Sequence, residues 1–98
     1  MQIRIEFFAQ AAAVAGSTEI SVEIQEGGHV LHAVEAAMDC KELSSKQEAD
    51  LRELLLTPQG KLHSWILASV NGIGVHNPSA HILSPGDALY LLPPISGG

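Results

Sequence analysis

The sequence predicts an α+β domain in which a mixed sheet of four to five strands has helices packed on one face. Residues 2–8 and 17–25 alternate apolar and polar side chains, as half-buried strands do. Residues 29–40 instead repeat apolar side chains at spacings of three and four, which predicts an amphipathic helix. Strand-like segments return near the C-terminus, and one sheet covered by helices makes a two-layer domain.

The first two strands are expected to form an antiparallel hairpin. The segment 2–8 places Phe7 on the apolar face and leaves Phe8 out of phase. The alanine-rich segment 9–16 follows and ends in a glycine, which predicts a short helical turn stopped at that glycine. Residues 17–25 then alternate again, so the loop of the hairpin is a long one.

A second helix is predicted after the first, over residues 44–56. Ser44 or Ser45 is expected to be its N-cap, and Ser45 with Glu48 fits the spacing of a capping box. A proline and a glycine a few residues later end the helical pattern. The helix over residues 29–40 can cross over the sheet, so that a later strand pairs with the first strand through a right-handed connection.

The C-terminal third of the chain reads as strands separated by turns. Residues 64–75 are rich in β-forming side chains and contain the turn signal Asn71-Gly72. Residues 84–87 have proline second and glycine third, which suits a type II turn. Residues 88–92 are then the last strand, and the aspartate before it is expected to hold the turn rather than to do acid–base chemistry.

Composition limits the classes of function. The chain has 98 residues, which predicts one domain over 1–92 followed by a flexible tail over 93–98. Its net charge is −6 with only five Lys and Arg residues, so a nucleic-acid partner is not expected. The single cysteine allows no intrachain disulfide. No signal peptide and no membrane-spanning run is found, so we expect a cytoplasmic protein without a membrane partner.

The C-terminal segment is the most informative part of the sequence. Two glycines at a free end add little to a fold, because they bury no side chain and lose much backbone freedom on ordering. A backbone without Cβ atoms can, however, enter a narrow channel, and two prolines would stiffen its base. The segment is therefore expected to reach into the active site of another protein; it reads Leu92-Pro93-Pro94-Ile95-Ser96-Gly97-Gly98.

Three stretches together resemble one known family. They are "IRIEFFAQ" (3–10), "ILASVNG" (66–72) and "SPGDALYLLPPISGG" (84–98). With the order of the strands, they resemble the ubiquitin-like, β-grasp sulfur carriers of the MoaD/ThiS family, and most closely the small subunit of molybdopterin synthase. The resemblance implies a β-grasp fold, and it implies a carrier that is not an enzyme by itself.

The resemblance also implies a mechanism. A ubiquitin-activating-type enzyme, using ATP and Mg, would adenylate the Gly98 carboxylate, and sulfur would replace AMP to give a thiocarboxylate at the end of Gly97-Gly98. The carrier would bind no cofactor of its own. The sulfur would pass to an acceptor in the large subunit of molybdopterin synthase, or in an equivalent enzyme. The partner-binding positions implied are Phe8, Leu92, Pro93, Pro94, Ile95 and Ser96.

Several alternatives remain open at this point. Phe8 could pack in the core instead of contacting a partner. Activated Gly98 could be joined to lysine amines, as in a protein modifier, or the carrier could serve thiamine or another thiolation pathway. A further possibility is a plain binding module in which the tail has no function. Cys40 reads as a small buried side chain, and the pair His29 and His32 has no convincing further metal ligand.

Overall fold

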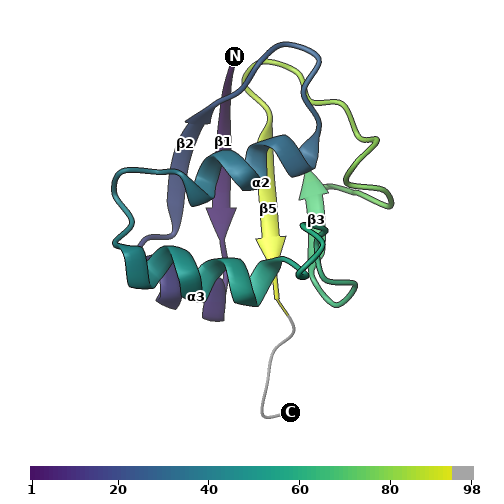
Figure 1. The fold of residues 1–98 in the computed structure, drawn as a ribbon. Helices are drawn as coiled ribbons and strands as arrows, with labels where there is room; N and C mark the ends of the chain where they lie inside the picture. Colours follow the sequence, from purple (N-terminus) through teal and green to yellow (C-terminus); the bar gives the residue numbers. More distant parts are fainter. Residues whose placement is uncertain (94–98) are drawn as a thin grey trace.

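A computed structural model describes residues 1–93 and shows two layers, a five-stranded sheet and two helices across one face of it (Figure 1). The strand order is β2-β1-β5-β3-β4, in which β1 and β5 are parallel and the other pairs antiparallel. The predicted α+β fold is therefore confirmed. The elements are β1 (Gln2–Phe7), α1 (Gln10–Ala15), β2 (Glu19–Glu23), α2 (Val30–Met38), α3 (Ser45–Leu55), β3 (Leu67–Val70), β4 (Ile73–Gly74) and β5 (Ala88–Leu92).

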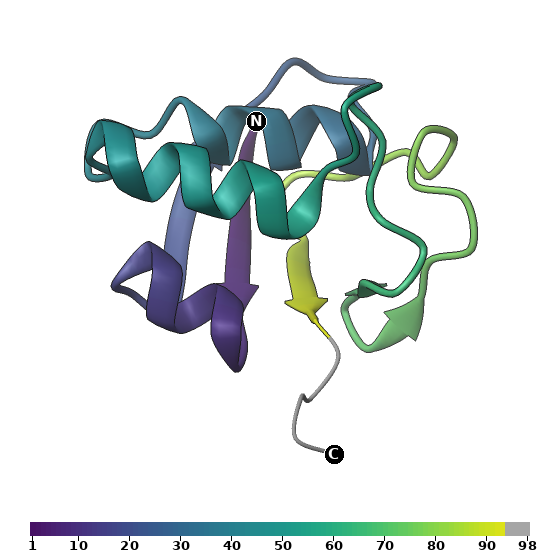
Figure 2. The ribbon, with the colours of Figure 1, turned by 60° about the horizontal axis from the view of Figure 1, so that its bottom comes forward.

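Side chains from the covered face of the sheet and from the helices form one core. The alternation of β1 buries Ile3, Ile5 and Phe7 almost completely. Helices α2 and α3 supply the other half of this core, and α1 packs against α3 at the end of the sheet where β1 and β5 finish (Figure 2). The apolar residues in this core are Ile3, Ile5, Phe7, Ile20, Val22, Val30, Val34, Met38, Leu51, Leu55, Leu89 and Leu91, among others.

The long connection from β4 to β5 forms backbone hydrogen bonds with the beginning of α2 and the residues before it. The Val30 N–H donates to the His81 carbonyl over 3.1 Å, and the Leu83 N–H donates to the Gly28 carbonyl over 2.9 Å. The connection thus satisfies backbone groups that a helix start leaves unpaired. Gly28 is required here because a Cβ would lie 2.9 Å from the Gln25 carbonyl oxygen.

The capping box of α3 lies one residue earlier than the spacing of Ser45 and Glu48 suggested. The Gln47 N–H donates to Ser44 Oγ over 3.1 Å, and the Ser44 N–H donates to Gln47 Oε1 over 2.9 Å. Ser44 is the N-cap because its backbone is extended, whereas Ser45 already belongs to the helix. The segment expected over 64–75 also proves shorter, since β3 begins only at Leu67.

Candidate functional site

The candidate site lies where the chain leaves the sheet. Strand β5 runs between β1 and β3, so its last residue is at the middle of one end of the sheet. Pro93, the next residue, is buried at the base of the tail. The remaining predicted site residues lie outside the described residues; they are Pro94, Ile95, Ser96, Gly97 and Gly98.

An apolar surface surrounds this exit on the open face of the sheet. Leu67 of β3 is paired with Leu92 of β5, and both project from the face that no helix covers. Leu67 is 66% exposed and belongs to a group of neighbouring apolar side chains. Together with Phe8 and Tyr90, these side chains line a shallow groove of about 470 Å³. We call the four residues Phe8, Leu67, Tyr90 and Leu92 the tail-exit patch.

The structure excludes one of the two alternatives left open for Phe8, which is packing in the core. Its side chain is 40% exposed, so it does not pack in the core. Strand β1 ends at Phe7, and Ala9 has a φ of +53°, so the chain turns immediately after Phe8. The Phe8 ring instead meets Tyr90 edge to face, with ring centroids 5.9 Å apart. This contact holds Phe8 beside the tail exit.

The other half of the open face is charged. Arg4 Nε lies 3.3 Å from Glu6 Oε2 and 3.8 Å from Glu19 Oε1, so one guanidinium links β1 to β2. At the far end of the same strands, the Met1 ammonium lies 2.6 Å from the Glu23 carboxylate and lowers the pKa of that side chain. Apolar side chains on this face are therefore gathered around the exit.

A polar clamp fixes the register that turns Tyr90 and Leu92 outward. The Asn71 side chain donates to Asp87 Oδ1 over 2.9 Å and accepts the Ala88 N–H over 3.0 Å. Asp87 also accepts the Ser84 N–H over 2.7 Å, so it holds its turn as the sequence predicts. The φ of +84° at Gly86 agrees with the expected type II turn.

His29 and His32 contact each other, and Cys40 packs against the core. The rings of His29 and His32 stack with centroids 3.7 Å apart, and the His29 N–H donates to His32 Nδ1. Burial, and secondly the nearby His32, lower the pKa of His29. Cys40 follows α2 and packs partly buried against the core. Residues 1–93 contain no group of three His, Cys, Asp or Glu side chains able to hold a metal ion.

Some site residues were missed in the sequence. Leu67 and Tyr90 belong to the tail-exit patch but were not singled out. The signal was present for Tyr90, because it lies two residues before Leu92 and so shares its face of the strand. Leu67 becomes recognisable only through its pairing with Leu92. None of the helices in the described part of the chain is long and apolar enough to cross a membrane.

No protein-family model and no curated protein matches the sequence. Solved structures do match it. SAMP1 from Haloferax volcanii is 26% identical, with a TM-score of 0.84 over 100% of both chains. A putative molybdopterin converting factor, subunit 1, from Pyrococcus furiosus is 19% identical, with a TM-score of 0.69 over 97% of this chain and 99% of that one.

A third match comes from a complex of two proteins. A chain of the BexX/CysO complex of Amycolatopsis orientalis is 20% identical, with a TM-score of 0.73 over 98% of this chain and 99% of that one. All three matches extend over essentially the entire chain. They confirm the resemblance inferred from the sequence: this chain has the ubiquitin-like β-grasp fold of the sulfur carriers and protein modifiers of the MoaD/ThiS type.

Proposed function

We propose that this chain is a sulfur carrier that reacts through its own C-terminus. In this proposal, a ubiquitin-activating-type enzyme uses ATP and Mg to adenylate the Gly98 carboxylate. The outer sulfur of a donor persulfide then displaces AMP and forms an acyl disulfide. A second thiol cleaves the S–S bond, which leaves a thiocarboxylate on Gly98 and a disulfide on the donor. The reaction would take place in the cytoplasm, where ATP is available, and the carrier itself would act as a co-substrate and not as an enzyme.

One observation supports this proposal most strongly. The apolar side chains of the open face gather where the chain leaves β5, and the two glycines follow five and six residues after Leu92. An exposed apolar surface around one point favours protein contact at that point. A partner that covers the tail-exit patch would draw the tail into its own active site. We therefore assign partner binding to Phe8, to Leu92 and to residues 93–96. We assign the reaction to Gly97-Gly98.

For the acceptor, we propose molybdopterin synthesis, with this chain as the small subunit of molybdopterin synthase. The resemblance of the segment 84–98 favours this role, and one of the matching structures carries the name of a molybdopterin converting factor subunit. The partner would be the large subunit of the synthase. A carrier for thiamine or another thiolation pathway would use the same activated Gly98.

A second candidate function is protein modification. The match with the highest identity among those above is SAMP1, and another structure of this kind is titled small archaeal modifier protein 1. In that case the activated Gly98 carboxylate would form an amide with a lysine amine of another protein. Both functions share the activation step and differ only in what attacks the activated carboxylate.

Intact-mass spectrometry of the protein from its native cells tests the proposal. A shift equal to the replacement of one oxygen by one sulfur, located in the C-terminal peptide, is the expected result. Gly98 conjugates on lysines, without a thiocarboxylate, would favour the modifier. Neither product in the presence of an active activating enzyme would leave a plain binding module. Deletion of Gly98 should abolish both products.

A further inference from the structure

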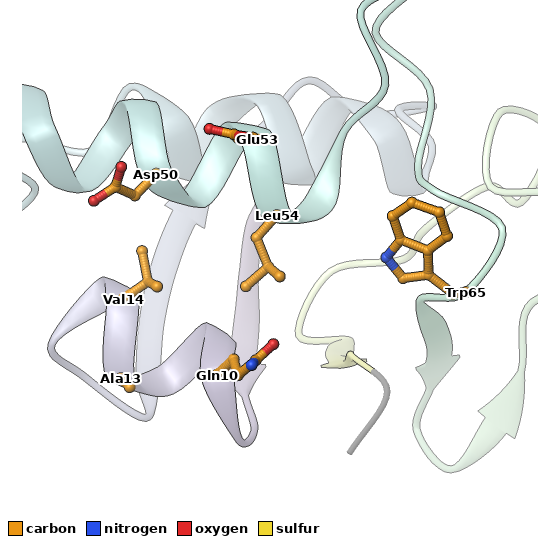
Figure 3. A pocket seen from close by; sticks show the side chains of 7 residues that line it. All are labelled: Gln10, Ala13, Val14, Asp50, Glu53, Leu54 and Trp65. Atoms are coloured by element: carbon orange, nitrogen blue, oxygen red, sulfur yellow. The ribbon is translucent and has the colours of Figure 1, made fainter. Parts of the chain in front are cut away.

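A second apolar groove lies on the helical side of the molecule, between α1, α3 and Trp65. Figure 3 shows Val14 pointing from α1 toward Asp50 and Leu54 pointing from α3 toward Gln10, with Trp65 at one end. The groove has a volume of about 460 Å³. It is separate from the tail-exit patch, since it shares no lining residue with it. We call it the α1–α3 groove.

Trp65 is held in an exposed position by its neighbours. Its side chain is 53% exposed, although it is the largest apolar side chain of the protein. One face of the indole stacks on His63, with ring centroids 4.0 Å apart and planes 12° apart. His63 Nε2 is in turn 3.3 Å from the Glu53 carbonyl oxygen of α3. The stacking contact orients the indole at the end of the groove, and about half of the side chain remains accessible there.

Two acidic residues of α3, Asp50 and Glu53, line the groove, and Figure 3 shows the Glu53 carboxylate directed away from Trp65. Asp50 is paired with Lys46, whose Nζ lies 3.1 Å from Asp50 Oδ2. Glu53 is exposed, and its carboxylate has no ion pair among residues 1–93. Among residues 1–93, no basic side chain lines the groove. The groove thus combines an aromatic face, an aliphatic floor and one uncompensated negative charge.

We propose that the α1–α3 groove binds a partner-protein segment that presents an arginine next to an aliphatic side chain. The guanidinium would lie against the exposed part of Trp65, and the exposed Glu53 side chain would turn toward it. The aliphatic side chain would pack on Val14 and Leu54. Cation–π contact and charge complementarity favour this chemistry, and the net charge of −6 would steer a basic partner toward the protein. The proposal does not depend on the chemistry of Gly98.

Titration of the full-length ¹⁵N-labelled protein with a short peptide tests the proposal. The probe is the blocked tripeptide leucine–arginine–leucine, and the control peptide has citrulline in place of arginine, which keeps the shape and removes the charge. We expect the arginine peptide to shift the amide resonances of Val14, Glu53 and Leu54 and to change the fluorescence of Trp65, the single tryptophan. The citrulline peptide should bind about tenfold more weakly.

Matched variants distinguish a local site from general attraction. Glu53→Lys should weaken binding of the arginine peptide about fivefold, and Trp65→Leu should do the same. Glu42→Lys makes the same change in net charge at an exposed position outside the groove and should leave the affinity unchanged.

Four results would overturn the proposal. They are absence of binding, equal binding of both peptides, equal weakening by Glu42→Lys, and shifts confined to the tail-exit patch. Shifts of the groove amides that grow with protein concentration alone would assign the groove to a second copy of the chain. An intact heteronuclear spectrum for each variant shows that it is folded, and the thiocarboxylate assay tests the proposed function separately.

Discussion

The two faces of the sheet use similar side chains for different ends. On the covered face, Leu89 and Leu91 of β5 are completely buried under the helices. On the open face, Tyr90 and Leu92 of the same strand remain partly exposed and continue into Leu67 and Phe8. The comparison teaches that apolar residues in adjacent positions can serve folding and recognition separately, because successive side chains of a strand point to opposite faces.

The open face is also divided along its length. Its β1–β2 half carries ion pairs around Arg4, and its β3–β5 half is apolar. Glu19 lies on the edge strand β2, where a charge discourages nonspecific strand pairing, whereas an apolar surface favours a specific contact. Under the proposed function, this division would direct a partner to the tail exit.

The largest effect on stability is expected from the covered face. Leu91→Ala removes a fully buried side chain and should lower the free energy of unfolding by about 2–5 kcal/mol. Leu92→Ala, one residue later, should cost less than about 1 kcal/mol because its side chain is partly exposed. Urea denaturation of both variants measures the difference. Equal losses would show that the two faces are not distinct in this way.

The next effect concerns binding and rests on the proposed function. Leu92→Lys and Phe8→Lys should each weaken binding to the activating enzyme by about 2 kcal/mol, or about thirtyfold, because a charge replaces an apolar contact. Titration calorimetry measures the affinity. Gln2→Lys adds the same charge on the polar half of the open face and serves as the control. Loss of affinity in Gln2→Lys alone would show that the enzyme binds the β1–β2 half of the open face and not the tail-exit patch.

An effect of similar size, on stability, is expected at the polar clamp that fixes the register of β5. Asn71→Ala removes two side-chain hydrogen bonds at a residue with a φ of +53°, and should lower the free energy of unfolding by about 2 kcal/mol. Asn71→Gly loses the same bonds but tolerates the backbone conformation, so its loss should be smaller. Thermal denaturation compares the two. A larger loss for the glycine variant would contradict this account.

The smallest effect is a pH dependence of stability, which arises from His29 at the beginning of α2. Because the pKa of His29 is lowered in the folded protein, the unfolded chain binds more protons below about pH 6.5. Stability should therefore fall as the pH drops from about 6.5 through the lowered pKa. His29→Gln should flatten this part of the stability curve, measured by urea denaturation at several pH values. His76→Gln changes an exposed histidine of the β4–β5 connection and is the control.

Local patterns explain which parts could be predicted. The alternation in β1 and β2 and the helical spacing in α2 each follow from the geometry of a single element, so the sequence was sufficient to identify them. The capping box was displaced by one residue because Ser44 and Ser45 are chemically equal, and only the backbone conformation selects between them. The site was partly identified, because the tail sequence and the position of Phe8 after the strand are local features.

The sequence alone determined the alternating faces of the strands, the two main helices and the Gly-Gly segment on which the proposed chemistry rests. The tertiary structure decided that Phe8 meets Tyr90, that Leu67 joins Leu92, and that the β4–β5 connection completes α2. It also decided that Trp65 stacks on His63 beside α3. The physical reason is the range of the interactions: periodicity reports a neighbour within one element, whereas most of these contacts join residues far apart in the chain and depend on how the sheet is assembled.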